Sequence, residues 1–173
     1  MDRMEKYALL FKMLYEKYDG ADDLGKKAAQ KIFYFFERKG IPLNLRYGIH
    51  YYGPYSGKLD DAMYELESEG YLSIDTSRAT HIISLGSIKA PETALSQEEK
   101  EIADDVLQVF EHKSPMDLEA LTTMDYVANV ILPKKSTEQD IINKFKEIKG
   151  TKFSSKTIMR TLDELKALEL IEV

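Results

Sequence analysis

The chain has 173 residues, of which 43% are hydrophobic and 31% charged, and its net charge of −6 argues against a protein that coats nucleic acid through bulk charge. It contains no cysteine, which excludes disulfides and thiolate metal sites. No apolar run reaches the roughly 18 residues of a membrane span, and the N-terminus lacks an export signal, so we expect a cytoplasmic protein without a membrane partner.

Residues 1–87 predict a winged-helix-like domain, mainly α-helical with a small antiparallel sheet. Apolar side chains recur at helical spacing in three segments, and short apolar strands follow the third. We expect helices over about 4–18, 22–39 and 57–69, and hairpin strands over 71–75 and 80–85. The first helix should end near Asp19–Gly20, and Ser56 can cap the third.

The segment 43–52 has a different period, because apolar and polar residues alternate along it. Alternation over nine residues is typical of a strand with one buried and one open face. A strand here would occupy the place of the supporting helix that a typical winged-helix unit carries before its recognition helix.

Residues 88–95 predict a linker, and residues 96–173 predict a helical domain. We expect its four helices over about 97–112, 115–132, 137–149 and 155–168. Ser96 with Glu99 predicts a capping box, Ser136 with Gln139 predicts a second one, and Ser154 is expected to begin the last helix. The last helix leads into 168–173 much as the helix at 57–69 leads into its strand, so this domain could copy part of the first as a wingless helix-turn-helix.

One stretch of the first domain resembles a known family. It contains Gln30 in Lys-Lys-Ala-Ala-Gln-Lys, then Tyr-Gly-Pro-Tyr-Ser at 52–56, and a helix ending in Leu66-Glu-Ser-Glu-Gly. These motifs resemble the uncharacterised YwgA-like bacterial and archaeal proteins and, more broadly, the Panacea group of antitoxin-type domains, over about residues 6–85. The resemblance implies a domain that neutralises toxins or acts as an adaptor through protein contacts. Tyr55 departs from the Panacea pattern, which more often has valine there.

Tyrosines gather around the Gly-Pro turn, and tyrosine is a frequent side chain at recognition surfaces. On a strand, Arg46 and His50 would share one face beside Tyr52, and an arginine can bind a carboxylate in a fork. We therefore predict a protein- or peptide-binding site of Arg46, His50, Tyr52 and Tyr55. An exposed sheet face with an aromatic rim is the alternative reading of the same residues.

A second hypothesis is DNA binding by the C-terminal helices. Six cations and one acid lie between Lys144 and Arg160, whereas the helix at 57–69 is acidic and poorly suited to phosphates. The residues predicted to contact DNA in this alternative are Lys152, Ser155, Lys156 and Arg160. A solvated basic surface would have the same composition.

Catalysis has little support in the sequence. The three histidines lack metal-ligand spacing, and no phosphate-binding loop or nucleophile-elbow motif is present. We expect no cofactor or metal and no enzyme activity, with an enzyme acting through Arg46 and His50 as the third hypothesis. The favoured function is non-catalytic recognition of another protein in a regulatory, antitoxin or adaptor role; DNA or a second copy of the chain are the alternative partners.

Overall fold

The computed structural model describes residues 2–18 and 23–173, which fall into two units. The first unit contains the residues up to Gly48 together with Tyr55–Pro115, and the second contains Ile49–Pro54 with Met116–Val173. The described part of the chain is mainly helical with two small antiparallel sheets, which confirms the predicted fold class. The predicted end of the first helix near Asp19–Gly20 lies outside the described residues.

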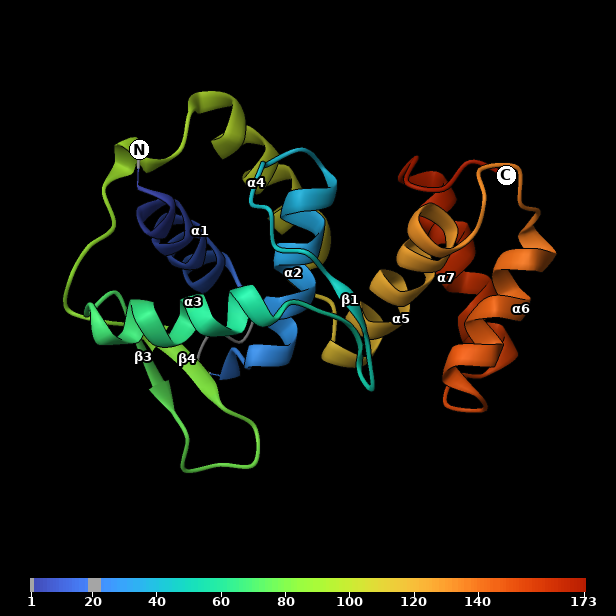
Figure 1. Cartoon of the computed structure of the whole chain (residues 1–173), viewed down its shortest axis with the longest axis horizontal. Coiled ribbons are helices and arrows are strands. Elements are labelled where there is room, and N and C mark those ends of the chain that lie inside the picture. The colour runs from blue at the N-terminus through green and yellow to red at the C-terminus, as the bar shows by residue number, and fades with distance from the viewer. Residues whose placement is uncertain (1, 19–22) are drawn as a thin grey trace. The chain divides into compact units, whose positions relative to one another are not determined.

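Figure 1 labels most of the elements along the chain. Those of the first unit are α1 (Arg3–Lys17), α2 (Lys26–Arg38), α3 (Gly57–Ser68), β3 (Leu72–Asp75), β4 (Ile82–Leu85), the 3-10 turn η2 (Glu92–Ala94) and α4 (Gln97–Phe110). The second unit has α5 (Pro115–Tyr126), the π-helix η3 (Val127–Ile131), α6 (Glu138–Lys149) and α7 (Ser155–Ala167). A short hairpin of β1 (Gly48–His50) and β2 (Gly53–Tyr55) lies in sequence between the two parts of the first unit, and its residues Ile49–Pro54 belong to the second unit.

Aromatic packing forms the core of the first unit. Phe33 of α2 lies with its ring centroid 4.4 Å from that of Phe11 of α1, and Phe35 stacks on Phe110 of α4 at 4.0 Å. All four side chains are buried. Helix α4 therefore packs on α1 and α2, which explains why it belongs to the first unit rather than to the predicted domain 96–173.

The predicted linker 88–95 is also part of this packing. Ala90, Ala94 and Leu95 are buried, and the Glu92 carboxylate lies 2.7 Å from the Lys12 ammonium of α1. The units of the structure thus divide at different positions from the predicted domains 1–87 and 96–173. The second unit carries nine Lys and Arg against ten Asp and Glu, so most of the acidic excess of the chain falls on the first unit.

The predicted strand over 43–52 is wrong for most of its length. Only Gly48–His50 is a strand, and residues 41–47 are irregular, with positive φ angles of 53° at both Asn44 and Arg46. The expected alternation of burial is present, since Leu43 and Leu45 are buried between exposed neighbours. The period-two pattern therefore reflects burial along an irregular segment rather than sheet pairing.

Hydrogen bonds from α2 and α3 hold this irregular segment. The Gln30 Nε2 donates to the Ser56 carbonyl at 2.9 Å, while the Ser56 N–H donates to Gln30 Oε1 at 2.9 Å. The Ser56 hydroxyl donates to the Leu45 carbonyl, and the Tyr47 hydroxyl to the Gln30 carbonyl. These contacts supply the backbone partners that a sheet would otherwise provide. Gln30 and Ser56, both in the family-like motifs, thus have a structural role.

Replacing Gln30 by alanine should lower the free energy of unfolding by about 1–3 kcal/mol, because the buried Ser56 N–H loses its acceptor and the Ser56 carbonyl loses the Gln30 amide, although it keeps the Asp60 N–H. Urea denaturation followed by circular dichroism measures this change. Gln139→Ala is the matched control, since its amide bonds only to exposed Asn143 and its loss should cost less than about 0.5 kcal/mol. Equal effects of the two substitutions would contradict this role for Gln30.

The predicted hairpin after the third helix is confirmed, with β3 and β4 antiparallel and Ile74 paired with Ile83. Backbone N–H groups on both of its edges donate hydrogen bonds outside the hairpin. The Ile74 N–H donates to the Glu67 carboxylate of α3 at 2.8 Å, and the Ile83 N–H donates to the Leu24 carbonyl at 2.8 Å. These bonds occupy edge groups that could otherwise pair with another strand.

Helix starts were predicted with mixed success. Ser56 caps α3, Ser96 and Glu99 form the capping box of α4, and Ser154 caps α7, all as expected. The capping box of α6 uses Thr137 and Asp140 instead of Ser136 and Gln139, one residue further along the chain. Both pairs have the required spacing, and threonine with aspartate performs the same two hydrogen bonds.

Two expected features of the C-terminal half differ in the structure. The helix predicted over 115–132 ends its α-helical part at Tyr126 and continues as the π-helix η3. The segment 170–173 is not a strand, although Leu170 and Ile171 are buried. The Asn129 side chain donates to the Leu170 carbonyl at 3.1 Å, so this backbone group is bonded to a helix and not to a wing.

Candidate functional site

The hairpin of β1 and β2 exposes two tyrosines at its turn. Tyr51 is 82% exposed and Tyr52 43%, and their rings meet edge to face with centroids 4.8 Å apart. Gly53, which follows them, has a φ of 94°, a conformation that favours glycine and lets the second strand begin at once. The turn therefore displays an aromatic pair of unusually high exposure.

A buried lysine of α6 holds the backbone of this turn. The Lys149 ammonium donates to the Tyr51 carbonyl at 3.0 Å, and its side chain is only 3% exposed. Lys149 is the last residue of α6, and Gly150 ends the helix with a φ of 59°. The end of α6 thus places a cation directly under the turn.

Glu119 of α5 joins Lys149 to a second lysine. Its Oε2 lies 2.9 Å from the Lys149 ammonium and 2.8 Å from that of Lys152, and its Oε1 accepts a hydrogen bond from Lys152 at 2.9 Å. The Glu119 side chain is 6% exposed, so this contact is a buried ion pair shared by two cations. Such a charge is tolerated inside a protein only because it is paired.

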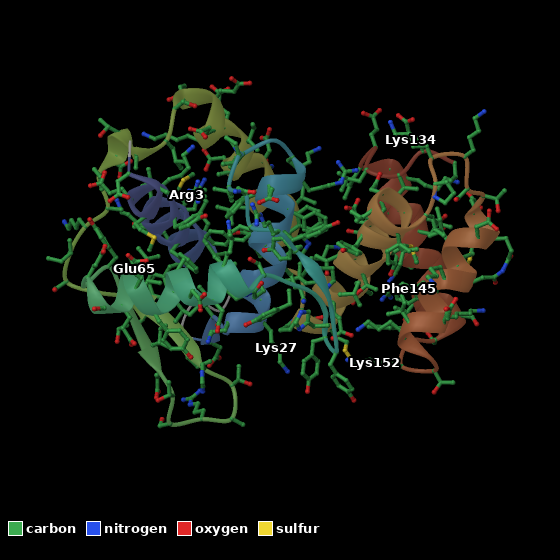
Figure 2. The ribbon with its side chains drawn as sticks, in the orientation of Figure 1. Arg3, Lys27, Glu65, Lys134, Phe145 and Lys152 are labelled. Carbon is green, nitrogen blue, oxygen red and sulfur yellow. The ribbon has the colours of Figure 1, made fainter. Side chains whose placement is uncertain are left out.

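Lys152, which is labelled in Figure 2, connects this ion cluster to the aromatic pair. Its ammonium lies 5.0 Å from the ring centroid of Tyr52, 5.9 Å from that of Tyr51 and 6.0 Å from that of Phe153. These distances fall within the range of cation–π attraction. We call Tyr51, Tyr52, Glu119, Lys149 and Lys152 the hairpin-tip site.

The two lysines also set the ionisation of Glu119. Burial alone would raise the pKa of this carboxyl group, but the hydrogen bonds and charges of Lys152 and Lys149 outweigh burial, so its pKa lies below the ordinary value of 4.5. Glu119 is therefore a carboxylate at neutral pH, and the three charged groups together carry one net positive charge.

The four residues predicted for protein binding are divided between the two units. His50 and Tyr52 belong to the second unit, and Arg46 and Tyr55 belong to the first. The shared strand face on which Arg46 and His50 were expected does not exist, because the strand begins only at Gly48. Burial and the neighbouring Asp60, to which its hydroxyl is hydrogen-bonded, raise the pKa of Tyr55. Of the four, Tyr52 is the one in the hairpin-tip site.

The residues predicted for DNA contact are only partly available. Lys152 is paired with Glu119, and an Arg160 guanidinium nitrogen lies 3.6 Å from an Asp117 oxygen. Ser155 and Lys156 are exposed in the first turn of α7. Lys149, another cation of the basic stretch, is buried in the hairpin-tip site. Pairing and burial therefore reduce the positive charge that this stretch can offer to phosphates.

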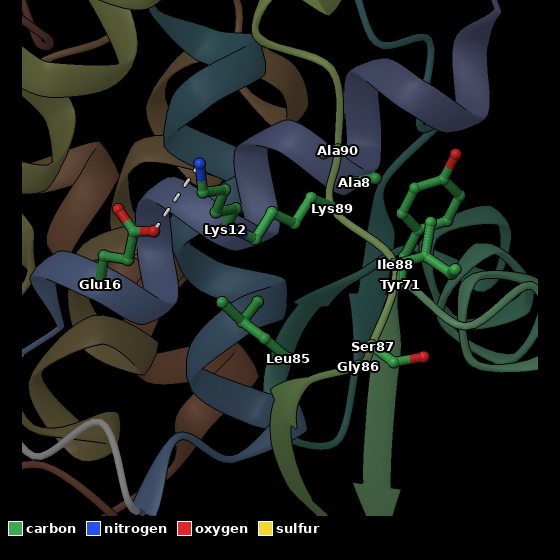
Figure 3. Close-up of a pocket in the computed structure, with 10 residues that line it drawn as sticks. All are labelled: Ala8, Lys12, Glu16, Tyr71, Leu85, Gly86, Ser87, Ile88, Lys89 and Ala90. Carbon is green, nitrogen blue, oxygen red and sulfur yellow. Dashed lines mark ion pairs between the residues drawn. The ribbon is translucent and has the colours of Figure 1, made fainter.

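A cavity of about 300 Å³ lies within the first unit between α1 and the segment after β4 (Figure 3). Ala8, Tyr71 and Ile88 contribute to its walls together with two lysines. One of them, Lys12, is already paired with Glu92 and with Glu16, 3.9 Å away. Because Lys12 is already paired with carboxylates, the cavity indicates a ligand class less clearly than the hairpin-tip site does.

Within the described residues, no group of three or more histidine, aspartate or glutamate side chains is placed to hold a metal ion. None of the helices in the described parts of the chain is both long and apolar enough to cross a membrane. Comparison of the chain with protein-family models and with curated proteins finds no match. Any proposal about function therefore rests on the residues of the hairpin-tip site.

The sequence prediction missed Glu119, and it treated Lys149 only as a surface cation. A signal for the lysine was present, since Ile141, Phe145 and Lys149 recur every four residues on one face of α6. Ile141 and Phe145 are buried, and so is Lys149, whereas Ile148 is only half-buried. A charged residue on a core row predicts a buried partner, here Glu119.

Proposed function

We propose that this protein is a non-catalytic recognition protein that binds another protein through the hairpin-tip site. The observation that carries the proposal is Tyr51, whose ring is 82% exposed while its carbonyl is held by a buried lysine. Exposed tyrosines on a fixed backbone are frequent energetic centres of protein interfaces. The resemblance to YwgA-like and Panacea-type domains, which implies an adaptor or antitoxin role, supports the same conclusion.

Charge supports protein recognition over DNA binding. The second unit has nine basic and ten acidic side chains, and several of its cations are paired or buried. A DNA-binding surface requires several cations that are available to phosphates. A mixed surface with an aromatic centre is instead typical of protein interfaces.

Photo-crosslinking from the turn tests this proposal. With a photoreactive phenylalanine analogue in place of Tyr51 in the full chain, we expect a specific partner to be captured from lysate of the native cell. Added as a competitor, the unchanged chain should reduce this capture. The Tyr51→Ala/Tyr52→Ala double variant should need a concentration about 30-fold higher or more for the same reduction, because removing an interface centre costs about 2 kcal/mol or more. Circular dichroism checks that the variant is folded.

Tyr64 of α3 provides the matched control. It is also an exposed tyrosine, at 45%, but it lies in the first unit beside the Lys26 ammonium. Crosslinking from position 64 should not capture the partner, and Tyr64→Ala should compete as well as the unchanged chain. Equal capture from positions 51 and 64, or full competition by the double variant, would refute the proposed function.

A further inference from the structure

We propose that the hairpin-tip site binds a protein segment in which an acidic side chain lies next to an apolar one. The carboxylate would meet the ammonium of Lys152, and the apolar side chain would meet the ring of Tyr51. This inference rests on the proposed function and adds the chemistry of the partner.

The charge of the site indicates an anionic ligand. One carboxylate, Glu119, is shared by two ammonium groups, so one positive charge stays uncompensated within the cluster. Exposure decides where a ligand can reach this charge. The Lys152 side chain is 28% exposed, against 3% for Lys149 and 6% for Glu119, so the available charge lies on Lys152.

Lys152 also has a hydrogen-bond donor to spare. An ammonium group has three N–H donors, and the two oxygens of Glu119 account for at most two of them. A carboxylate from a partner can accept the remaining one in a charge-assisted hydrogen bond. Lys149 is less suited to this role, because it is buried and already contacts both Glu119 and the Tyr51 carbonyl.

The aromatic pair supplies the apolar half of the site. The two tyrosine rings lie at 81° to each other and form a corner, and the Lys152 ammonium lies within 6 Å of both ring centroids. A ligand that binds the Lys152 ammonium therefore lies close to these rings. A segment with an acidic residue close in sequence to a leucine or phenylalanine can bind the Lys152 ammonium and contact the tyrosine rings at the same time.

A cationic ligand fits this site less well. It would have to displace Lys152 from Glu119, and the carboxylate would still be neutralised by Lys149. A nucleic acid would need further exposed cations next to the two tyrosine rings, whereas two of the three charged side chains of the site, Lys149 and Glu119, are buried. The balance of charge thus favours an acidic protein segment over a basic one or a nucleic acid.

The experiment uses the full chain on an array of synthetic peptides. Each peptide carries one aspartate or glutamate within three positions of a leucine or phenylalanine in a glycine–serine background; matched peptides carry asparagine or glutamine, or lysine or arginine, at the acidic position. We expect the acidic peptides to be bound, more weakly as salt rises. Lys152→Met and Tyr51→Ala should each reduce binding about tenfold.

Lys156→Met is the control variant, since it removes an exposed cation of α7 outside the site and should bind as the unchanged chain does. The inference is overturned if the amide or basic peptides bind equally well, if no peptide binds, if Lys152→Met has no effect, or if duplex DNA competes better than the acidic peptides. Lys152→Met keeps the Glu119–Lys149 pair, and circular dichroism verifies its fold.

The crosslinking assay separates this inference from the proposed function. One outcome is that the Tyr51→Ala variant fails to compete for the captured partner while the Lys152→Met variant competes as well as the unchanged chain. In that case the site binds a protein without using the Lys152 cation, and only the inference fails. If both variants compete as the unchanged chain does, both proposals fail.

Discussion

Replacing Glu119 with alanine is expected to lower the free energy of unfolding by about 3–5 kcal/mol, the cost of removing one partner of a buried ion pair. The variant leaves Lys149 with its side chain 3% exposed and without its carboxylate. Urea denaturation followed by circular dichroism measures the loss. Hydrogen exchange should show the loss of protection in α5 and α6, which carry the pair.

Glu147→Ala is the control for this prediction. Glu147 pairs with Lys144 at 3.2 Å on the surface of α6, with its side chain 69% exposed, so its removal should change stability by less than about 1 kcal/mol. A loss for Glu119→Ala no larger than that of this control would show that the buried pair does not stabilise the protein.

The pH dependence of stability gives a further readout of the same group. Because the folded-state pKa of Glu119 is lowered, its carboxylate stabilises the fold fully above the unfolded-state pKa of about 4.5, and this contribution is lost as pH falls through the lower folded-state pKa. Glu119→Ala should therefore lose less stability than the unchanged chain does when both are moved from pH 6 to pH 3. A parallel decline of the two would contradict this assignment.

Replacing Phe35 with alanine should cost about 3–5 kcal/mol in the first unit, because it removes a fully buried ring and leaves a cavity. The ring of Phe35 stacks on that of Phe110, with 2° between their planes, and contacts Tyr34 edge to face. Thermal and urea unfolding of the variant measure the loss.

A double-mutant cycle with Phe110→Ala makes this prediction specific. If α4 packs on α2 as described, the double variant should lose about 0.5–1.5 kcal/mol less stability than the sum of the two separate losses, because each single substitution already removes the shared ring contact. Strict additivity would contradict that packing and favour the predicted domain boundary at 88–95, in which α4 belongs with the C-terminal helices.

Helices and their ends were the most predictable part of the fold. Their apolar period and capping residues are local signals, and Ser56, Ser96 and Ser154 each cap the helix that they were expected to begin. The domain boundary was less predictable, because whether α4 packs on α2 depends on the contact of Phe35 with Phe110, 75 positions apart. The composition of 88–95 contains no such information.

The irregular segment shows a different limit of sequence reasoning. Alternating burial at Leu43 and Leu45 is a true property of the chain, but a strand also needs a neighbouring strand. Here Gln30, Glu37 and Ser56 bond the backbone of the segment or its close neighbours, and Asn44 adopts a positive φ. Period-two burial is therefore necessary for a half-buried strand but not sufficient.

The hairpin-tip site and the residues predicted from sequence overlap only in part. Tyr52 was predicted for protein binding because tyrosines cluster at the Gly-Pro turn, and Lys152 was predicted for DNA contact. Glu119 could not be connected to either lysine from sequence, since 30 residues separate it from Lys149. Pairing across that distance is decided by how α5 and α6 pack.

The bond from Lys149 to the Tyr51 carbonyl has a consequence for binding thermodynamics. A free hairpin loop loses conformational entropy when it docks, and that loss weakens the complex. Here the backbone of the loop is tethered before any partner arrives, so less entropy is left to lose. A partner should therefore bind this loop as it would bind a preorganised surface, and the resulting complex should dissociate slowly.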